Sequence, residues 1–468
     1  MKEEISTNKM GTESVPKVML TMGIPIVFSM VLQACYNIVD SMFVARIQDS
    51  SGEIANMGEY ALNALTLAFP VQMLVVSFAI GTGVGVNALL AKCLGQNDKE
   101  RASKAAGNGV TLGFIIYVCF LIFGLFGIDI YLKSQTSDQI ILDMGTKYLK
   151  ICTLVCFGNV MFGIYEKLLQ STGKSLFSTI AQVAGAVVNI ILDPILIFGY
   201  FGLPKMGVSG AAYATIVGQI VSMLVAMIFH YSKNKEVESG LKYLKLNKNI
   251  VKEIYMVGIP AIIMQALMSF MTYGVNIIFV AVSKEAVTAY GIFYKIQQFL
   301  FFAAFGLRDA ITPIVSFNYG MGNKKRVNQG IKYGILYVEI IMLVGIIVFE
   351  ICAKPLVGMF SLSDKTAELC ILAVRLIATG FLFAGANMAL QGVFQALGCG
   401  ISSLIVSLLR LCVVVLPLAW LFTKMANAEF MMWLAFPIAE AAAFIVAAVC
   451  MMRANKQIIQ TMENRELS

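Results

Sequence analysis

A carboxylate stands inside an apolar stretch of this sequence. Asp193 follows Asn189 by four residues and precedes Pro194, in a segment that is apolar from residue 177 to residue 201. An ionised Asp in hydrocarbon is tolerated only where it faces a protein interior, a watery cavity or a cation. Asn189 adds a carbonyl oxygen on the same helical face, and Pro194 frees a backbone carbonyl. This pattern predicts part of a small-cation site, and the alternative is a bent helix end with an acid near the interface.

A second polar stripe lies in the first apolar segment. Gln33, Asn37 and Asp40 are spaced i, i+4 and i+7, so they share one face of a helix and must point inward. Asp40 is a second carboxylate in an apolar run, and we expect it to join Asn189 and Asp193 in binding the cation. Na⁺ is a possible metal ion at these residues.

Two further polar residues are candidates for the same site. Glu166 precedes Gln170 by one helical turn, and Thr215 follows a run of small residues at 209–212 that allows close helix approach. The alternative for Glu166 is an ion pair with Lys167 or Lys174, and the alternative for Thr215 is a hydroxyl bonded back to its own helix. The predicted ion-coupling residues are Asp40, Glu166, Asn189, Asp193 and Thr215.

The composition requires a membrane protein. Of the 468 residues, 59% are hydrophobic and 13% are charged, far from the roughly 25% charged residues of soluble domains. We predict about twelve transmembrane helices, because apolar runs of 20 or more residues recur along the whole chain. Lys and Arg lie in short loops, where they set topology, so the net charge of +8 does not indicate nucleic acid. The predicted spans are 17–45, 59–91, 104–127, 139–168, 175–200, 207–231, 250–281, 285–317, 329–352, 366–395, 400–423 and 429–453.

The two halves of the chain repeat. Gly-Ile-Pro at 23–25 recurs at 258–260, the turn at 94–101 recurs at 319–326, and the turn at 170–173 recurs at 395–398. We predict an N-lobe at 1–231, a cytoplasmic linker at 232–249 and a C-lobe at 250–468. With an even number of spans in each half, the repeats are parallel, the plan of a transporter with two rocking bundles.

The candidate acids occur in the first half alone. At the matching offsets Asp40 becomes Val275, Glu166 becomes Gln391, Asn189 becomes Val414 and Asp193 becomes Leu418. Residues needed for packing in one repeat should be needed in the other. Because the candidate acids occur in one repeat only, they favour a cation site in the first bundle.

These motifs resemble the multidrug and toxic compound extrusion (MATE) family, and within it the MepA-like branch. The resemblance rests on residues 37–40, 170–174, 189–194, 210–215 and 313–320. It implies an all-α membrane protein of twelve helices in two six-helix lobes, related by a pseudo-two-fold axis along the membrane normal. It also implies multidrug efflux by antiport, in which lipophilic and mostly cationic compounds leave in exchange for Na⁺ or H⁺ by alternating access, and so xenobiotic export and antibiotic resistance.

The resemblance also carries the ion site onto Asp40, Asn189, Asp193 and Thr215. Glu166 departs from the Asn that many relatives have, which leaves the choice of coupling ion open. We expect side chains beside these acids, and methionines of the seventh span, to line the substrate cavity. The candidates are Gln33, Tyr36, Asn37, Met264 and Met268, and the alternative for the methionines is packing.

Two other functions are considered, a flippase for lipid-linked oligosaccharides on the same fold and a cation channel. A flippase usually needs arginines that face a central cavity, so the surroundings of Arg308, Arg375 and Arg410 bear on this choice; pairing with acids is the default. Gly173-Lys174-Ser175 lacks the earlier glycine of a phosphate loop, so we expect no ATP site. We expect no enzyme activity and no cofactor other than the coupling ion.

The charge pattern predicts orientation. Alternate loops are rich in Lys and Arg, which places both termini and the central linker in the cytoplasm. The ten cysteines lack metal spacing and are expected to pack in a chain that faces a reducing compartment. We expect a monomer in the cell inner (plasma) membrane, surrounded by lipid, with small lipophilic cations as its ligands and no nucleic-acid partner.

Overall fold

The computed structural model describes residues 8–48, 57–360 and 362–462, and every regular element within these ranges is helical. The α-helices of the first half are α1 (Lys9–Thr12), α2 (Val15–Val44), α3 (Met57–Gly95), α4 (Lys99–Phe126), α5 (Ile128–Gln135), α6 (Gln139–Leu154), α7 (Phe157–Ser171), α8 (Ser175–Phe198) and α9 (Val208–Lys233), with short 3₁₀ turns η2 (Tyr200–Gly202) and η3 (Leu241–Leu244). Those of the second half are α10 (Lys248–Val280), α11 (Lys284–Gly320), α12 (Lys324–Gly358), α13 (Asp364–Ala378), α14 (Phe381–Ala396), α15 (Gly400–Leu408), α16 (Val415–Phe422) and α17 (Ala428–Ala454), with π-helical turns η4 (Leu409–Val413) and η5 (Asn455–Ile459).

The predicted membrane spans are confirmed as helices. In the described ranges, 10 helices are long and apolar enough to cross a membrane, or up to 12 if each of two bent pairs is one span. The pairs are α6 with α7, bent by 45°, and α13 with α14, bent by 55°. They are the predicted fourth and tenth spans, so the bend recurs in both repeats. At the second bend, a Cβ on Gly380 would lie 2.7 Å from Cα of Pro437, so glycine permits this close approach to α17.

The described chain divides into two compact units. The α2–α9 unit consists of Val31–Leu90 and Lys99–Ile254, and the α10–α17 unit consists of the described residues up to Met30, Ala91–Asp98 and the described residues from Tyr255 onward. Three of the unit boundaries therefore fall inside α2, α3 and α10, and one lies just before α4. The predicted division at 1–231, 232–249 and 250–468 follows the sequence repeats and stays a prediction.

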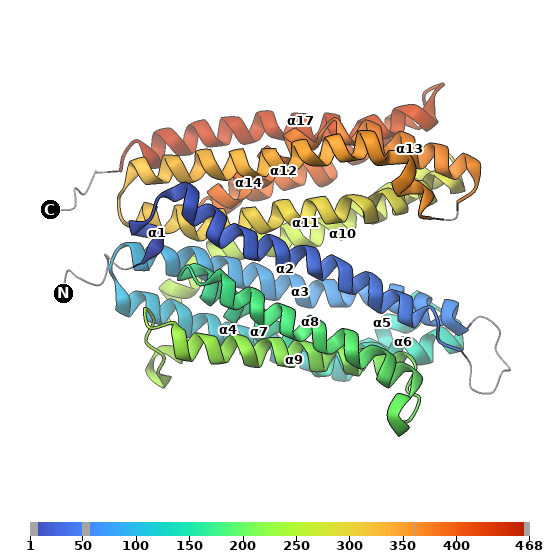
Figure 1. Cartoon of the computed structure of the whole chain (residues 1–468), viewed down its shortest axis with the longest axis horizontal. Coiled ribbons are helices and arrows are strands. Elements are labelled where there is room, and N and C mark those ends of the chain that lie inside the picture. The colour runs from blue at the N-terminus through green and yellow to red at the C-terminus, as the bar shows by residue number, and fades with distance from the viewer. Residues whose placement is uncertain (1–7, 49–56, 361, 463–468) are drawn as a thin grey trace. The chain divides into compact units, whose positions relative to one another are not determined.

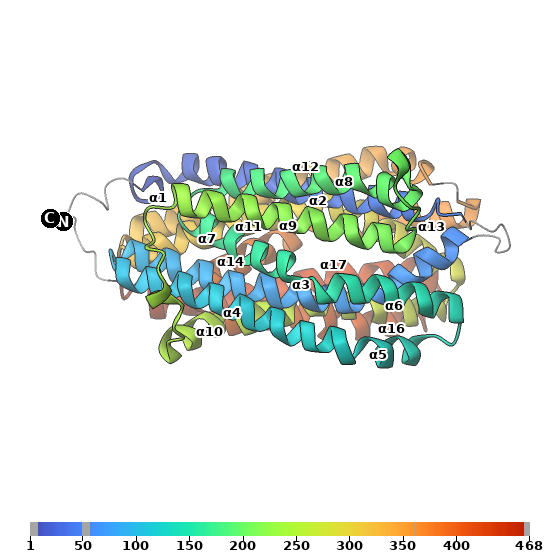
Figure 2. The ribbon, with the colours of Figure 1, turned by 90° about the horizontal axis from the view of Figure 1, so that it is seen from below.

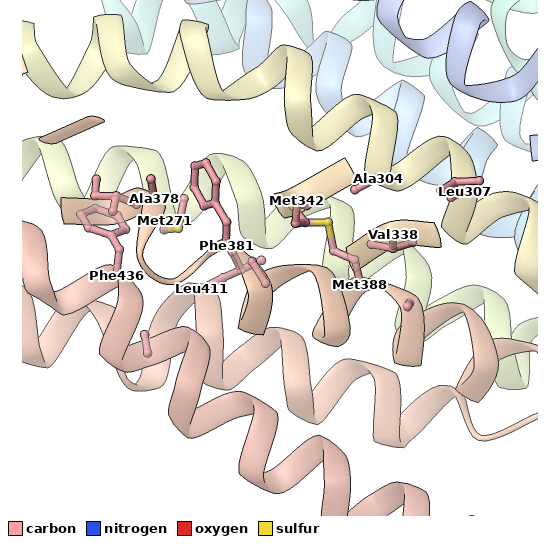
Figure 3. Close-up of a cluster of buried hydrophobic side chains, with 14 of the residues drawn as sticks. Met271, Ala304, Leu307, Val338, Met342, Ala378, Phe381, Met388, Leu411 and Phe436 are labelled. Carbon is pink, nitrogen blue, oxygen red and sulfur yellow. The ribbon is translucent and has the colours of Figure 1, made fainter. Parts of the chain in front are cut away.

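The core of the α10–α17 unit is built from aliphatic, aromatic and methionine side chains. Met342 of α12 and Met388 of α14 are fully buried and lie next to each other (Figure 3). Phe381 of α14 joins the same cluster and stacks edge-on against Phe349 at 5.5 Å. The methionines of this cluster therefore fill space in the core, as flexible apolar side chains do.

In the α2–α9 unit, helices α8 and α9 lie side by side (Figures 1 and 2). Glycines bring their backbones together. A Cβ on Gly185 would lie 2.4 Å from the carbonyl oxygen of Gly218, and a Cβ on Gly210 would lie 2.5 Å from the carbonyl oxygen of Leu196. Small residues let helix backbones approach closely. In a membrane such packing holds helices together, because the hydrophobic effect does not drive them to associate there. This packing buries the face of α8 that carries Asn189 and Asp193.

The segment between α9 and α10 packs against α4. The side-chain amide of Asn108 donates to the carbonyl oxygens of Tyr243 and Lys245, at 3.3 and 3.2 Å, and its own oxygen accepts from the backbone N–H of Asn247 at 2.8 Å. A Cβ on Gly107 would lie 2.3 Å from the carbonyl oxygen of Tyr243. The predicted linker is thus held against α4 by hydrogen bonds between its backbone and Asn108.

The repeated turns end in arginines that hold the start of a long helix. Arg101 binds both carboxylate oxygens of Glu253, near the start of α10, at 2.6 and 2.7 Å. Arg326 donates to the carbonyl oxygens of Met10 and Glu13, just before α2, at 2.8 and 2.7 Å. Planar guanidinium groups suit such paired acceptors. The repeat therefore preserves an anchoring role for arginine with different acceptors.

Candidate functional site

Asp40 and Asp193 lie at the same end of the α2–α9 unit. Asp40 precedes the last residue of α2 by four positions, and Asp193 precedes the last residue of α8 by five. The two helix ends are adjacent, since the rings of Phe43 and Phe198 are 6.4 Å apart. Asp40 and Asp193 are close enough to interact electrostatically. The structure thus brings together two carboxylates that are far apart in the sequence.

Both carboxylates keep an oxygen without a hydrogen-bond donor. Asp193 is fully buried; its Oδ1 accepts from the amide of Asn189 at 3.3 Å, and its Oδ2 has no partner in the described chain. Oδ1 of Asp40 is likewise buried without a partner among the described residues. Unpaired buried anions are costly, so this arrangement favours a bound cation or proton.

Further polar side chains of α2 and α8 lie beside the two acids. The hydroxyl of Tyr36 interacts with Gln33 and with both carboxylates. Gln33 accepts a hydrogen bond from the amide of Gln182 on α8 at 3.0 Å, which links α2 to α8. The predicted residues Gln33 and Tyr36 therefore lie at this site.

Two residues at the site were missed by the sequence reasoning. Tyr148 on α6 interacts electrostatically with Asp40, and its hydroxyl accepts from the amide of Gln72 on α3 at 3.2 Å. Both are polar residues in apolar spans, the signal that identified the other candidates.

Thr215 and Asn37 are less closely tied to the acids. Thr215 is half-buried on α9, three residues before the glycine that contacts Asn189, and no hydrogen bond joins its hydroxyl to Asp193 in the described chain. Asn37 lies on α2 with an exposed side chain. Their predicted roles as ion and cavity residues stay predictions.

The structure separates Glu166 from the other acids. Glu166 lies about 8 Å before the end of α7, while Asp193 lies about 27 Å along α8 from the turn that joins the two helices, at 1.5 Å per residue. Glu166 instead accepts from Gln170 at 3.0 Å and lies 3.9 Å from the ammonium of Lys167, which is itself bound to Gln170 at 2.9 Å. These contacts correspond to the alternative in which Glu166 forms an ion pair with Lys167. Glu166 does not lie beside Asp40 and Asp193 as expected, because α7 and α8 run antiparallel.

The two methionines proposed for the substrate cavity lie in packed surroundings. Met264 is 7% exposed and its sulfur accepts from the hydroxyl of Ser403 at 3.2 Å. Met268 is partly buried against the core of the α10–α17 unit. Their surroundings correspond to the packing alternative.

The three arginines of interest each contact a carboxylate. Arg410, on the π-helical turn, binds Glu440 through Nε and Nη2, at 2.9 and 2.6 Å. Arg308 binds Asp309 at 2.8 Å, and Arg375 lies 3.7 Å from Glu350. The guanidinium groups therefore have acidic partners within their own unit, as expected for charges inside apolar runs.

The pair of acids has the donor set for a hard cation. Carboxylate and amide oxygens are the ligands that hard cations prefer, and two nearby carboxylates can alternatively share a proton. Within the described ranges, no cluster of three or more His, Cys, Asp or Glu residues could hold a metal ion.

Comparison with known proteins identifies the family. The MatE family model matches residues 25–195 and 260–421. Among curated proteins, the chain is similar to "Multidrug export protein MepA" of Staphylococcus aureus (strain MRSA252), with 26% identity over 430 residues and 89% of each chain covered. The protein of the same name from Staphylococcus saprophyticus is 25% identical over 420 residues, with 90% of each chain covered.

Solved structures show the same fold. One, described as "Crystal structure of MATE in complex with MaL6", has a TM-score of 0.90 at 24% identity, with 98% of this chain and 100% of that chain covered. Another, described as "Outward-facing conformation of a multidrug resistance MATE family transporter of the MOP superfamily", has a TM-score of 0.89 at 24% identity, with 97% and 99% covered. With the family model matched over most of its length, this all-helical, multi-pass membrane protein belongs to the MatE family of transporters.

Proposed function

We propose that this chain exports lipophilic, mostly cationic compounds across the plasma membrane in exchange for Na⁺ or H⁺. The observation that carries the proposal is the pair of Asp40 and Asp193, each with a buried oxygen that lacks a donor in the described chain. The similar proteins from Staphylococcus carry the name of a multidrug export protein, which supports the substrate class.

Coupling follows from the two acids. Each carries negative charge into an apolar environment, and binding of Na⁺ or H⁺ relieves the repulsion between them. A lipophilic cation drawn to the same negative potential then competes with the ion. Binding of one ligand releases the other, and no ATP is required.

Alternating access requires that the ion favour one conformation over the other, because a ligand with equal affinity for both states shifts nothing. Helix α2 provides a lever. It contains Pro25, and the boundary between the two compact units falls within it, after Met30. Proline interrupts the helical hydrogen bonds, so α2 can bend near Pro25 when Asp40 is neutralised.

The arginines favour an exporter over a flippase. Recognition of a lipid-linked anion needs guanidinium groups that are free to bind it, whereas Arg308, Arg375 and Arg410 have acidic partners at 2.8, 3.7 and 2.6 Å. Breaking the buried pair of Arg410 with Glu440 would leave an uncompensated charge. An arginine would have to leave its acidic partner before it could bind an anion, so these contacts disfavour an anion-binding role.

The test is transport of a fluorescent lipophilic cation by the purified protein in proteoliposomes, under separately imposed Na⁺ and H⁺ gradients. We expect one gradient to drive uptake, with saturation and counter-transport, which a channel would not show. The apparent dissociation constant of the dye should rise with Na⁺ or with falling pH, and the effect should vanish in Asp40→Asn. Full gradient-driven export by both Asp40→Asn and Asp193→Asn would remove the acids from the mechanism.

The proposed orientation places the segment between α9 and α10 in the cytoplasm and the start of α13 outside. The exposed side chains of Lys245 and Ser363 allow this to be tested by Lys245→Cys and Ser363→Cys in a cysteine-free background. An impermeant thiol reagent added to whole cells should label the second and spare the first. Labelling of Lys245→Cys but not of Ser363→Cys would show that the topology is the reverse of the one proposed.

A further inference from the structure

Helix α8 carries a polar stripe that runs well beyond the acid pair. Its members are spaced by four, three, seven and four residues, so they lie on one face of the helix, within an arc of about 80° at 3.6 residues per turn. They are Ser175, Thr179, Gln182, Asn189 and Asp193. From Ser175 to Asp193 the stripe covers about 27 Å, nearly the thickness of a bilayer's hydrocarbon core.

The stripe lies inside the α2–α9 unit. Ser175 and Asp193 are fully buried, and Asn189 and Thr179 are 4% and 6% exposed. The lipid-facing side of the same helix is apolar, with exposed Ile180, Val187 and Ile191. The polar residues are therefore directed into the unit and away from lipid.

Four side chains of the stripe have a buried oxygen with no hydrogen-bond partner in the described chain. These oxygens are Ser175 Oγ, Thr179 Oγ1, Gln182 Oε1 and Asp193 Oδ2. The hydroxyl of the neighbouring Ser178 instead donates to the carbonyl oxygen of Ser175 at 2.8 Å. Hydroxyls in apolar helices commonly bond back in this way, whereas the two hydroxyls of the stripe, on Ser175 and Thr179, have no such partner in the described chain. Buried polar groups without partners cost free energy unless a water or ion satisfies them.

We infer that this stripe conducts the coupling cation between the Asp40–Asp193 pair and the other end of α8, entirely within the α2–α9 unit. The oxygens would take over the hydration of a small monovalent cation, or hold the waters that relay a proton, at intervals of one helical turn, with two turns between Gln182 and Asn189. This inference rests on the proposed ion coupling. It adds a route for the ion along α8, beyond the acid pair itself.

The test is the substitution Thr179→Val, which removes a hydroxyl in the middle of the stripe and preserves side-chain shape. Two matched variants accompany it. Thr179→Ser retains the hydroxyl, and Ser178→Ala removes a neighbouring buried hydroxyl that is already bonded back to its own helix. Dye exchange is measured in proteoliposomes under separate Na⁺ and H⁺ gradients, and dye affinity is measured at equilibrium in detergent across Na⁺ and pH titrations.

We expect Thr179→Val to slow exchange by about tenfold, the size of effect typical for one lost buried hydrogen-bonding group. Thr179→Ser and Ser178→Ala should exchange at nearly the unmutated rate. The ion-dependent shift in dye affinity should be the same in all of these variants, because the acid pair is unchanged. The gradient that drives exchange identifies whether Na⁺ or H⁺ uses the stripe.

Three outcomes would overturn the inference. Unmutated exchange rates in Thr179→Val would show that the hydroxyl is not on the route. Equal slowing in Ser178→Ala would indicate a packing effect, and loss of the equilibrium ion response in Thr179→Val would place Thr179 in the ion site. Failure of the proposed function is a separate result, since it appears as full export by Asp40→Asn and Asp193→Asn.

Discussion

The amide of Asn189 donates to Oδ1 of Asp193 across 3.3 Å, one helical turn away on α8. This bond orients the carboxylate so that its second oxygen remains without a partner in the described chain. It also leaves the amide oxygen of Asn189 as a neutral ligand beside the acid. The pair thus combines a fixed charge with a group that holds it in position.

Asn189→Ala should weaken the response to the coupling ion without unfolding the protein. We expect the Na⁺ or H⁺ concentration that half-displaces the dye to rise by about tenfold, since one ligand and one orienting hydrogen bond are lost. Equilibrium dye titration measures this. Asn427→Ala, an exposed amide just before α17, should leave the ion response unchanged; equal effects of the two substitutions would argue against a specific role for Asn189.

Gly218→Ala should disturb the site through packing. The new Cβ would lie 2.7 Å from the carbonyl oxygen of Gly185 and 3.0 Å from Cβ of Asn189, so α8 must shift. We expect a loss of about 1–3 kcal/mol in stability, seen as a lower Tm, together with a weaker ion response.

Gly291→Ala is the matched control, because Gly291 is exposed in α11 and a Cβ there would meet nothing within 4 Å. It should leave Tm unchanged or raise it slightly, since Ala is the better helix former. A normal Tm and ion response in Gly218→Ala would show that α8 and α9 can separate without consequence.

Lys167→Met should destabilise the protein strongly. Lys167 is 1% exposed, its ammonium lies 3.9 Å from Glu166 and it donates to Gln170 at 2.9 Å, so the substitution removes a buried charge and these contacts. Breaking a buried pair costs about 3–5 kcal/mol. Thermal unfolding in detergent is the measurement. The double variant Glu166→Gln with Lys167→Met should recover most of the loss, and a double variant less stable than Lys167→Met would contradict the pairing.

Asn108→Ala should release the segment between α9 and α10 from α4. Asn108 holds the backbone of that segment through three hydrogen bonds, to Tyr243, Lys245 and Asn247. We expect faster tryptic cleavage after Lys242 and Lys245, measured on the purified protein. Asn249→Ala, at an exposed position nearby, should be cleaved at the unmutated rate, and equal rates in both variants would mean that other contacts hold the segment.

The helices and several site residues followed from local sequence. The spans near 17–45 and 207–231 correspond to α2 and α9 within a few residues, because a helix in an apolar environment must be apolar over its whole length. Asp40 and Asp193 were identifiable because a carboxylate in such a run requires a partner, whatever the fold around it.

Which of these residues meet depended on tertiary packing. Glu166 met the same sequence criterion as Asp193, yet the antiparallel course of α7 and α8 places it about 19 Å away along the helix axes, beside Lys167. Tyr148 lies near Asp40 although more than 100 residues separate them in the sequence. Side-chain type and spacing determine which face of a helix is polar. The partners on other helices are set by close approaches such as that of Gly185 to Gly218, which depend on how complete helix surfaces fit together.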